Sequence, residues 1–244
     1  MRPSSSRHIA PVGIVVALAA EARLLGSAVR RGDALTLADG TRLAVTGVGC
    51  EAAAEGARRL IAAGCRSLAS WGLAGGLDPA LVAGDLVLPE EVVLEGGASL
   101  VTAQAWREQV ACSLEAARHP AASGKLLTSA HALETVAGKS SAFGCTQAVA
   151  VDMESFAVAQ VAAAGGVPFI AVRAIVDTAA DEVPSALASA ADAAGAVSVG
   201  RVIARLAVRP AQLAALLRLA VRYRAATRSL RAVAASGALT ASGT

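Results

Sequence analysis

Aromatic residues are scarce in this chain of 244 residues, at 2% of the composition. Proteins that bind single-stranded nucleic acids stack the bases on aromatic side chains, so the composition argues against that partner. The chain also lacks any run of 18 apolar residues without a charge or a helix breaker, which argues against a membrane-spanning helix. The hydrophobic share is still 55%, much of it alanine and valine, which suffices for the core of one α/β domain.

Cysteines are few, and acidic residues are missing from the carboxyl-terminal part of the chain. The four cysteines, at positions 50, 65, 112 and 145, form no CxxC pair and have no histidine pattern beside them, so no metal site is expected. Thiols without a disulfide framework indicate a reducing compartment, the cytoplasm. Acids are absent from residues 193–244, where eight arginines give a charge of +8; because the whole chain carries +3, the rest carries −5.

The amino terminus permits two interpretations. Two early arginines followed by the apolar stretch 9–20 imitate a secretory signal peptide. Pro11 and Gly13 interrupt that stretch, which favours a first core strand over 12–18. The residues after it, 19–25, then begin a helix.

The stretch 148–177, AVAVDMESFAVAQVAAAGGVPFIAVRAIVD, organises the rest of the chain. Its pattern predicts a short strand, a helix over 156–164 that two glycines end, and a second strand over 169–175. Two parallel strands joined by a helix form a βαβ unit, and ligands bind in the crevice at the carboxyl ends of such strands.

Acidic side chains follow three of the predicted strands. Glu154 and Asp177 are expected on the rim of one pocket, and Glu21 is a third acid placed to face the same crevice. For Glu21, Asp152 and Glu154, a helix-capping or first-turn role is the competing interpretation. Asp177 follows an apolar strand, and a buried acid needs a compensating partner or a function.

Further elements follow from the same patterns. Strands are predicted at 34–37, 43–46, 67–71, 85–89 and 126–129, and helices at 51–63, 106–117, 186–206 and 211–233. Asp39-Gly40 predicts a hairpin turn, and a glycine-rich turn is expected at 72–76, with backbone N–H groups free to receive an anion or a sugar oxygen. A further helix is expected to contain His131 and Leu133.

A dinucleotide-binding motif is the main competing interpretation of the glycines. Residues 47–52, GVGCEA, fit the G-x-G-x-x-G/A pattern. That site also needs an acid about 20 residues on, at the end of the next strand, to hold the ribose. The first acid after the strand at 67–71 is Asp78, beyond the strand end, so the pattern disfavours NAD binding.

Five stretches resemble the nucleoside phosphorylase and nucleosidase superfamily. They are GIVVALAAE at 13–21, TGVGCEAA at 46–53, WGLAGGLDP at 71–79, AVDMES at 150–155 and PFIAVRAIVD at 168–177. The branch that the chain resembles most is the adenosyl-cleaving nucleosidases. RPAQLAALLRLA at 209–220 is also similar to hopanoid-associated phosphorylase-like proteins, which are linked to the cleavage of adenine from adenosylhopane.

The resemblance implies a single three-layer αβα domain with a central mixed, mostly parallel sheet. The catalytic domain is expected at 9–208, followed by a basic amphipathic helix and loose tail at 209–244. It also implies a homodimer. A basic helix without acids is suited to an anionic membrane surface, so we expect a cytoplasmic protein, peripheral at the inner face of the membrane; a solvated outer helix is the alternative.

The resemblance also implies roles for individual residues. Asp177 is expected to protonate purine N7, and Glu154 to hold the ribose hydroxyls. Glu21 is expected to activate the attacking water. The other substrate-binding positions that the resemblance implies are Met153, against the sugar, and Ala74, Gly75, Leu133 and Asp152.

Three positions depart from the family pattern. Leu133 stands where nucleosidases stack a phenylalanine on the base, and Leu73 stands where relatives often have serine. Arg23 is close to the phosphate-holding arginine of phosphorylases but out of register. Water is therefore favoured as the nucleophile, with inorganic phosphate as the alternative co-substrate and no other cofactor expected.

The predicted activity is cleavage of the purine N-ribosidic bond of an adenosyl compound, adenosylhopane in hopanoid side-chain synthesis, releasing adenine. The alternatives are phosphorolysis of the same bond, a 5′-methylthioadenosine/S-adenosylhomocysteine nucleosidase, and a nucleoside-binding protein without turnover.

Overall fold

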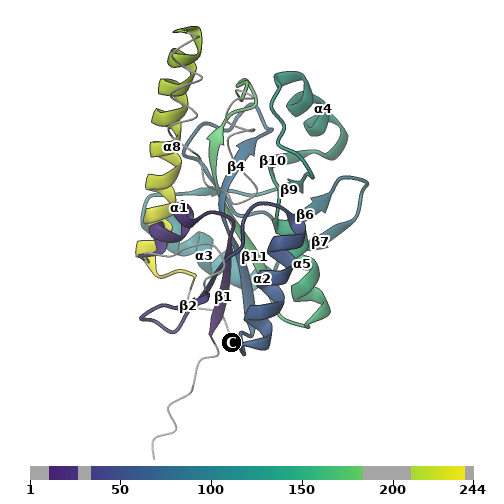
Figure 1. The fold of residues 1–244 in the computed structure, drawn as a ribbon, viewed down its shortest axis with the longest axis vertical. Helices are drawn as coiled ribbons and strands as arrows, with labels where there is room; N and C mark the ends of the chain where they lie inside the picture. Colours follow the sequence, from purple (N-terminus) through teal and green to yellow (C-terminus); the bar gives the residue numbers. More distant parts are fainter. Residues whose placement is uncertain (1–10, 27–33, 184–209, 240–244) are drawn as a thin grey trace, which may run out of the picture.

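The computed structural model describes residues 11–26, 34–183 and 210–239. These residues form one mixed sheet of 11 strands with helices on both faces (Figure 1). Six of the ten strand pairings in the described part of the chain are parallel. The predicted α/β class, with a three-layer αβα arrangement and a mixed, mostly parallel sheet, is confirmed.

The centre of the sheet is β4 (Ser67–Gly76), a strand of ten residues. It pairs in parallel with β1 (Val12–Val16) on one side and with β11 (Phe169–Asp177) on the other. The next strand outward, β3 (Arg42–Val45), is parallel to β1. Because parallel strands end at the same edge of a sheet, the residues that follow β1 and those at the ends of β4 and β11 gather there.

β10 (Ala148–Asp152) joins the end of β4 in the antiparallel direction and pairs in parallel with β9 (Lys125–Thr128). β10 is antiparallel to β4 whereas β11 is parallel to it, so β10 and β11 are antiparallel and the predicted parallel βαβ unit is wrong. Both strands pair with β4 instead, and Val151 and Asp177 are both register partners of Gly75. The shared partner brings the ends of β10 and β11 together.

The remaining strands lie toward the edges of the sheet. They are β2 (Ala34–Thr36), β5 (Leu86–Val87), β6 (Glu91–Leu94), β7 (Ser99–Val101) and β8 (Ala121–Ala122). The predicted hairpin is confirmed, since β2 pairs with β3 in the antiparallel direction and the Thr41 N–H donates to Asp39 Oδ1 over 2.9 Å.

Helices cover both faces of the sheet. α2 (Cys50–Ala62) and α5 (Ser155–Ala164) pack on one face, and α3 (Gln104–Ala116) and α8 (Pro210–Ser236) pack on the other. These four match predicted helices. Three further helical segments complete the described part: α1 (Ala19–Ala22), the 3-10 helix η1 (Arg23–Leu25) and α4 (Val136–Thr146). The helix predicted at 186–206 lies outside the described residues.

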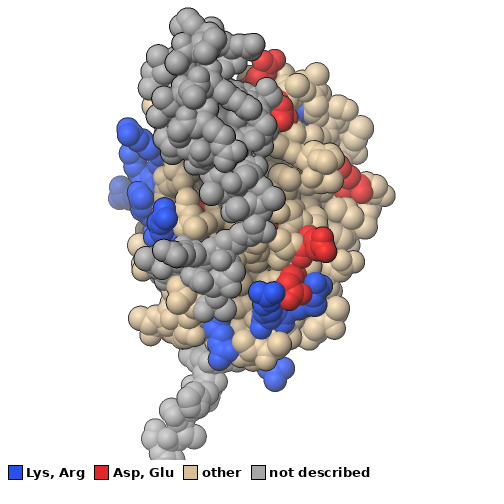
Figure 2. Space-filling model, in the orientation of Figure 1, with Lys and Arg blue, Asp and Glu red and all other residues tan. Residues whose placement is uncertain are grey.

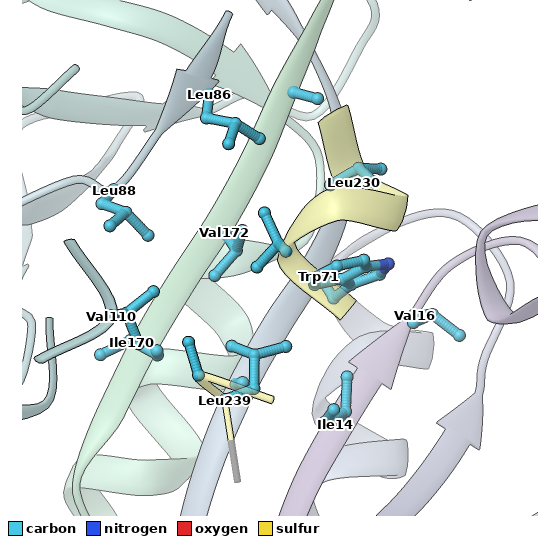
Figure 3. Packing of buried hydrophobic residues seen from close by; sticks show 14 of the residues in the cluster. Ile14, Val16, Trp71, Leu86, Leu88, Val110, Ile170, Val172, Leu230 and Leu239 are labelled. Carbon is cyan, nitrogen blue, oxygen red and sulfur yellow. The ribbon is translucent and has the colours of Figure 1, made fainter. Parts of the chain in front are cut away.

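The carboxyl-terminal helix contributes to the core. Ala226, Leu230 and Val233 of α8 are fully buried. In Figure 3, Leu230 lies over the sheet beside Trp71 of β4 and Val172 of β11. α8 is therefore amphipathic, as predicted, and its apolar side is already occupied by the sheet. The domain division at residue 209 stays a prediction, because 184–209 lie outside the described residues.

Two local predictions are wrong. Residues 72–76 continue β4 instead of forming a turn, and their backbone pairs with β11 and β10, so this segment is not an open anion cradle. His131 and Leu133 lie in the loop before α4, not in a helix. The helix begins only at Val136 because Thr135 caps it, its Oγ1 accepting the Gly138 N–H over 3.1 Å.

Candidate active site

The strand ends surround a cavity of about 230 Å³. Its wall is built from residues after β1, at the ends of β4, β10 and β11, and in the loop before α4. All eight residues predicted for the site lie on this wall: Glu21, Ala74, Gly75, Leu133, Asp152, Met153, Glu154 and Asp177. The structure brings the predicted residues together, while their individual roles stay predictions.

Much of the wall is apolar. Leu18, Val48, Leu73, Leu133 and Val176 line it, and the described lining residues include no phenylalanine, tyrosine or tryptophan. A flat base would therefore pack mainly against aliphatic side chains, and the imidazole of His131 is the one aromatic ring among the described lining residues. An apolar wall also destabilises ionised carboxylates, and burial raises the pKa values of Glu21, Glu154 and Asp177.

Glu21 is a buried carboxylate held by two backbone donors. The Leu18 N–H donates to Oε2 and the Leu73 N–H donates to Oε1, both over 3.0 Å. Burial raises the pKa of Glu21, and the Arg173 guanidinium and the backbone N–H groups offset part of this rise. A carboxylate whose pKa is raised toward neutral pH is suited to accept a proton from water.

Glu154 is held by the turn before α2. The Gly49 N–H donates to Glu154 Oε1 over 2.9 Å. Gly49 has a φ of 105°, a conformation that side chains oppose, which is why glycine stands here. Burial, with the nearby charge of Asp152, raises the pKa of Glu154 to about 7. The G-x-G turn thus orients a carboxylate of the cavity.

Arg173 is a site residue that the sequence patterns did not single out. It is buried in β11, where Nε donates to Asp152 Oδ2 over 2.9 Å. Its Nη2 donates to Ser70 Oγ over 2.7 Å and to Ser155 Oγ over 3.0 Å. Asp152 also accepts the Thr128 hydroxyl over 2.8 Å, so both of its oxygens are used within the protein. These contacts suit Asp152 to hold Arg173 in place. Its substrate-binding role stays a prediction.

Asp177 meets a second cation that sequence patterns did not single out, Lys139 of α4. The Lys139 ammonium is fully buried and donates to Asp177 Oδ2. Burial raises the pKa of Asp177, and Lys139 opposes that rise. A charged residue inside the weakly polar segment 136–146 is the sequence signal that marks Lys139.

Gly72 leaves the space that two site residues occupy. A Cβ at this position would lie 2.5 Å from Arg173 Nη1 and 2.6 Å from Glu21 Oε1. Contacts this short do not occur, so only glycine lets Glu21 and Arg173 lie over the strand.

Fold and site together define an α/β protein with a cavity at its strand ends that buried acids surround. Among the residues that the structure describes, no group of His, Cys, Asp and Glu side chains is arranged to hold a metal ion. A family model described as the phosphorylase superfamily matches residues 12–215. The chain belongs to this superfamily.

Solved structures of similar fold include two kinds of nucleoside-cleaving protein. The 5′-methylthioadenosine/S-adenosyl homocysteine nucleosidase of Campylobacter jejuni has 20% identity and a TM-score of 0.63, over 72% of this chain and 89% of that one. Futalosine hydrolase of Helicobacter pylori has 16% identity and a TM-score of 0.67, over 92% and 97% of the two chains. At these identities the likeness shows a shared fold. No curated protein sequence matches the chain.

Proposed function

We propose that the protein hydrolyses the N-ribosidic bond of a purine nucleoside. The observation that carries the proposal is the meeting of three acids from three strand ends, Glu21, Glu154 and Asp177, in one apolar cavity. Breaking this bond requires a proton for the leaving base, a nucleophile for C1′ and contacts that hold the sugar. Three separately held carboxyl groups supply one group for each requirement.

In the proposed reaction, Asp177 gives its proton to purine N7 as the bond between C1′ and N9 breaks and its electron pair goes to the base. The oxygen of a water molecule bonds to C1′, and the proton that the water loses goes to Glu21. Glu154 accepts hydrogen bonds from the ribose hydroxyls, and Met153 packs against the sugar. Burial raises the pKa values of all three acids, which favours the protonated form of Asp177 and proton acceptance by Glu21.

Water is the proposed nucleophile because the described lining of the cavity offers phosphate no arginine or lysine. Phosphate sites rely on arginine, lysine or free backbone N–H groups. Among the described lining residues there is neither arginine nor lysine. Arg23 is exposed and is not one of them, and Leu73 supplies no hydroxyl. The alternative is phosphorolysis, and a reaction rate that depends on phosphate would establish it.

The proposed substrate is an adenosyl compound with a large apolar group on the ribose 5′ carbon, adenosylhopane in hopanoid side-chain synthesis. Two features support this choice: the resemblance of residues 209–220 to hopanoid-associated proteins, and the arginines of α8. Four of these, Arg218, Arg224, Arg228 and Arg231, are exposed. In Figure 2, blue side chains gather along the side of the molecule where α8 lies in Figure 1.

A lipid nucleoside lies in a membrane, so the enzyme would work at the membrane surface. No described helix is both long and apolar enough to cross a bilayer. We propose peripheral binding of the cytoplasmic protein to an anionic surface through α8. The homodimer that the resemblance implies stays a prediction, which light scattering of the purified protein tests.

The deciding experiment measures adenine release from adenosylhopane, 5′-methylthioadenosine and S-adenosylhomocysteine, each with and without phosphate. We expect phosphate-independent release of adenine and free ribose product, fastest with adenosylhopane. Faster release from the two small nucleosides would assign the alternative nucleosidase activity. Tight binding of all three compounds without any release would identify a nucleoside-binding protein and overturn the proposal.

A further inference from the structure

Lys139 makes three hydrogen bonds from a completely buried position. Its Nζ donates to Asp177 Oδ2, to the carbonyl oxygen of Thr178 over 2.8 Å and to the carbonyl oxygen of Asp181 over 3.0 Å. An ammonium group has three N–H donors, and a neutral amine has two. The three acceptors therefore match the charged form of the lysine.

Lysine is an unusual choice at this position. The chain has 22 lysines and arginines, and only Lys125 and Lys139 are lysines. Lys125 is a surface residue that pairs with Glu91 over 3.5 Å. Lysine is almost never fully buried unless it is paired, because desolvation of the charge is costly. A compact ammonium can meet three converging acceptors, whereas the planar guanidinium of arginine cannot take the same place.

The two oxygens of Asp177 have different surroundings. Lys139 occupies Oδ2, and no hydrogen bond within the described residues reaches Oδ1. Asp177 lines the cavity, so one carboxyl oxygen is fixed by the protein and the other is left for a ligand.

We propose that Lys139 is a positioning residue for Asp177, holding Oδ2 and stabilising the carboxylate that forms when the acid gives its proton to the base. The inference rests on the proposed function, since it gives Asp177 the role of general acid. Asp177 is neutral before the transfer and negative after it. The attraction of a fixed ammonium is therefore stronger in the transition state than in the ground state, which accelerates the step.

Other charges also face Asp177. Asp181, in the loop after β11, accepts the Thr178 N–H over 2.9 Å and pairs with Arg222 of α8 over 2.6 Å. Burial raises the pKa of Asp177; Lys139 and Arg222 lower it and Asp181 raises it. Lys139 is the direct partner among these charges, so its removal is expected to raise the Asp177 pKa.

The test compares Lys139→Met with Lys125→Met, which makes the same change at the exposed lysine. The first measurement needs no substrate: the carboxyl-carbon NMR signal of Asp177, assigned with Asp177→Asn, is titrated in labelled protein. The second is the pH profile of kcat/KM. In Lys139→Met we expect a raised Asp177 pKa and a basic limb moved to higher pH. We also expect kcat to fall on the order of 10-fold to 100-fold, part of the usual contribution of a general acid.

An unchanged Asp177 titration and an unchanged basic limb in folded Lys139→Met would overturn the inference. A lysine that only stabilises the fold would lower the melting temperature without moving either. If Lys139→Met does not fold, Lys139→Arg takes its place. Arginine keeps the positive charge but does not fit the three acceptors, so the basic limb of the pH profile should stay at its wild-type position while kcat falls. A wild-type kcat in Lys139→Arg would overturn the inference. If the wild-type protein cleaves no nucleoside, the proposed function fails, and the titration still decides whether Lys139 controls Asp177.

Discussion

Gly49 and Glu154 are 105 positions apart in the chain, and the backbone N–H of the first donates to the carboxylate of the second over 2.9 Å. This contact ties the turn before α2 to the segment between β10 and α5. It fixes a carboxyl group that burial would otherwise leave poorly satisfied. The conformation of one glycine thus affects the orientation of a proposed sugar-binding residue.

Replacing Gly49 with alanine should disturb this contact. The φ of 105° and ψ of 159° lie in a region that only glycine adopts readily, so Gly49→Ala should lower the free energy of unfolding by about 1–3 kcal/mol. KM should rise, because Glu154 loses its fixed donor. The control is Gly144→Ala at an exposed position in α4 with nothing near the added Cβ, where alanine should stabilise by up to about 1 kcal/mol. Urea unfolding of both variants shows whether their changes in the free energy of unfolding have opposite signs.

Glu154 should reduce stability above neutral pH. Its pKa is about 7 in the folded protein and near 4.5 when exposed. Between these values the folded state binds a proton that the unfolded state does not, so stability falls as the pH rises through this window. Above pH 7 the penalty is on the order of 3 kcal/mol, because each pKa unit corresponds to about 1.4 kcal/mol.

Glu154→Gln removes this penalty and keeps an oxygen that can accept the Gly49 N–H. We expect the variant to be more stable than wild type at pH 8 and equal to it below pH ~4.5, where the glutamate is protonated in both states. It should also lose activity, as the amide is a weaker acceptor for the ribose hydroxyls. Glu55→Gln, at a half-exposed glutamate on the surface of α2, should not reproduce this trend. Unfolding curves at several pH values measure the stability of both variants. The same pH dependence in Glu154→Gln and Glu55→Gln would contradict the expectation.

Gly72→Ala should damage the site more than the fold. The added Cβ would displace Glu21 and Arg173, and a displacement of about 1 Å can cost on the order of 100-fold in rate. The melting temperature should fall moderately, because the strand can still form its hydrogen bonds. Steady-state kinetics and thermal unfolding, with Gly144→Ala as the reference, measure the two effects. A normal kcat would show that Glu21 tolerates the move and does not act on the water.

Local patterns located the strands that carry the site and the three acids, because an apolar run followed by a charge marks a strand end, but they missed the short strands β6, β7 and β8. They failed where the partner of a segment matters more than its own sequence. Residues 72–76 were expected to form a turn because they are rich in glycine, whereas the glycines here make room for Glu21, Arg173 and Asp177 beside a continuous strand. Strand order failed for the same reason, since nothing within residues 148–177 reveals that β4 pairs with both strands.

The sequence patterns missed the two cations of the site because each pairs with an acid that is distant in the sequence and close only in the folded protein. Arg173 lies within an apolar strand, and Lys139 lies in a helix with little amphipathic pattern. The acids closest in sequence, Asp177 for Arg173 and Glu134 for Lys139, are not their ion-pair partners. Their partners, Asp152 and Asp177, are 21 and 38 positions away. A charge isolated in a weakly polar segment is the signal that could have identified both.

The arginines of α8 should bind anionic membranes. Arg224, Arg228 and Arg231 are exposed while the opposite side of the helix packs on the sheet, so replacing all three with glutamine should leave the core intact. Each basic residue near a membrane contributes about 1 kcal/mol, so binding to vesicles with anionic lipid should weaken on the order of 100-fold. The control replaces three exposed arginines away from α8, Arg58 and Arg59 of α2 and Arg66, in the same way. Equal binding of both variants in vesicle sedimentation would exclude this role for α8.

Asp177→Asn separates proton donation from binding. The amide can still donate a hydrogen bond to purine N7 and accept one from Lys139, so KM should change little. It cannot transfer a proton to the leaving base, and kcat should fall by ~100-fold to 10,000-fold, the usual contribution of a general acid. Asp39→Asn, in the turn between β2 and β3, makes the same change away from the cavity and should keep full activity, since asparagine also serves in such turns. Rates of adenine release over a range of substrate concentrations give both constants. Wild-type kcat in Asp177→Asn would mean that another group protonates the base, and Asp177 would then have to be reassigned to binding.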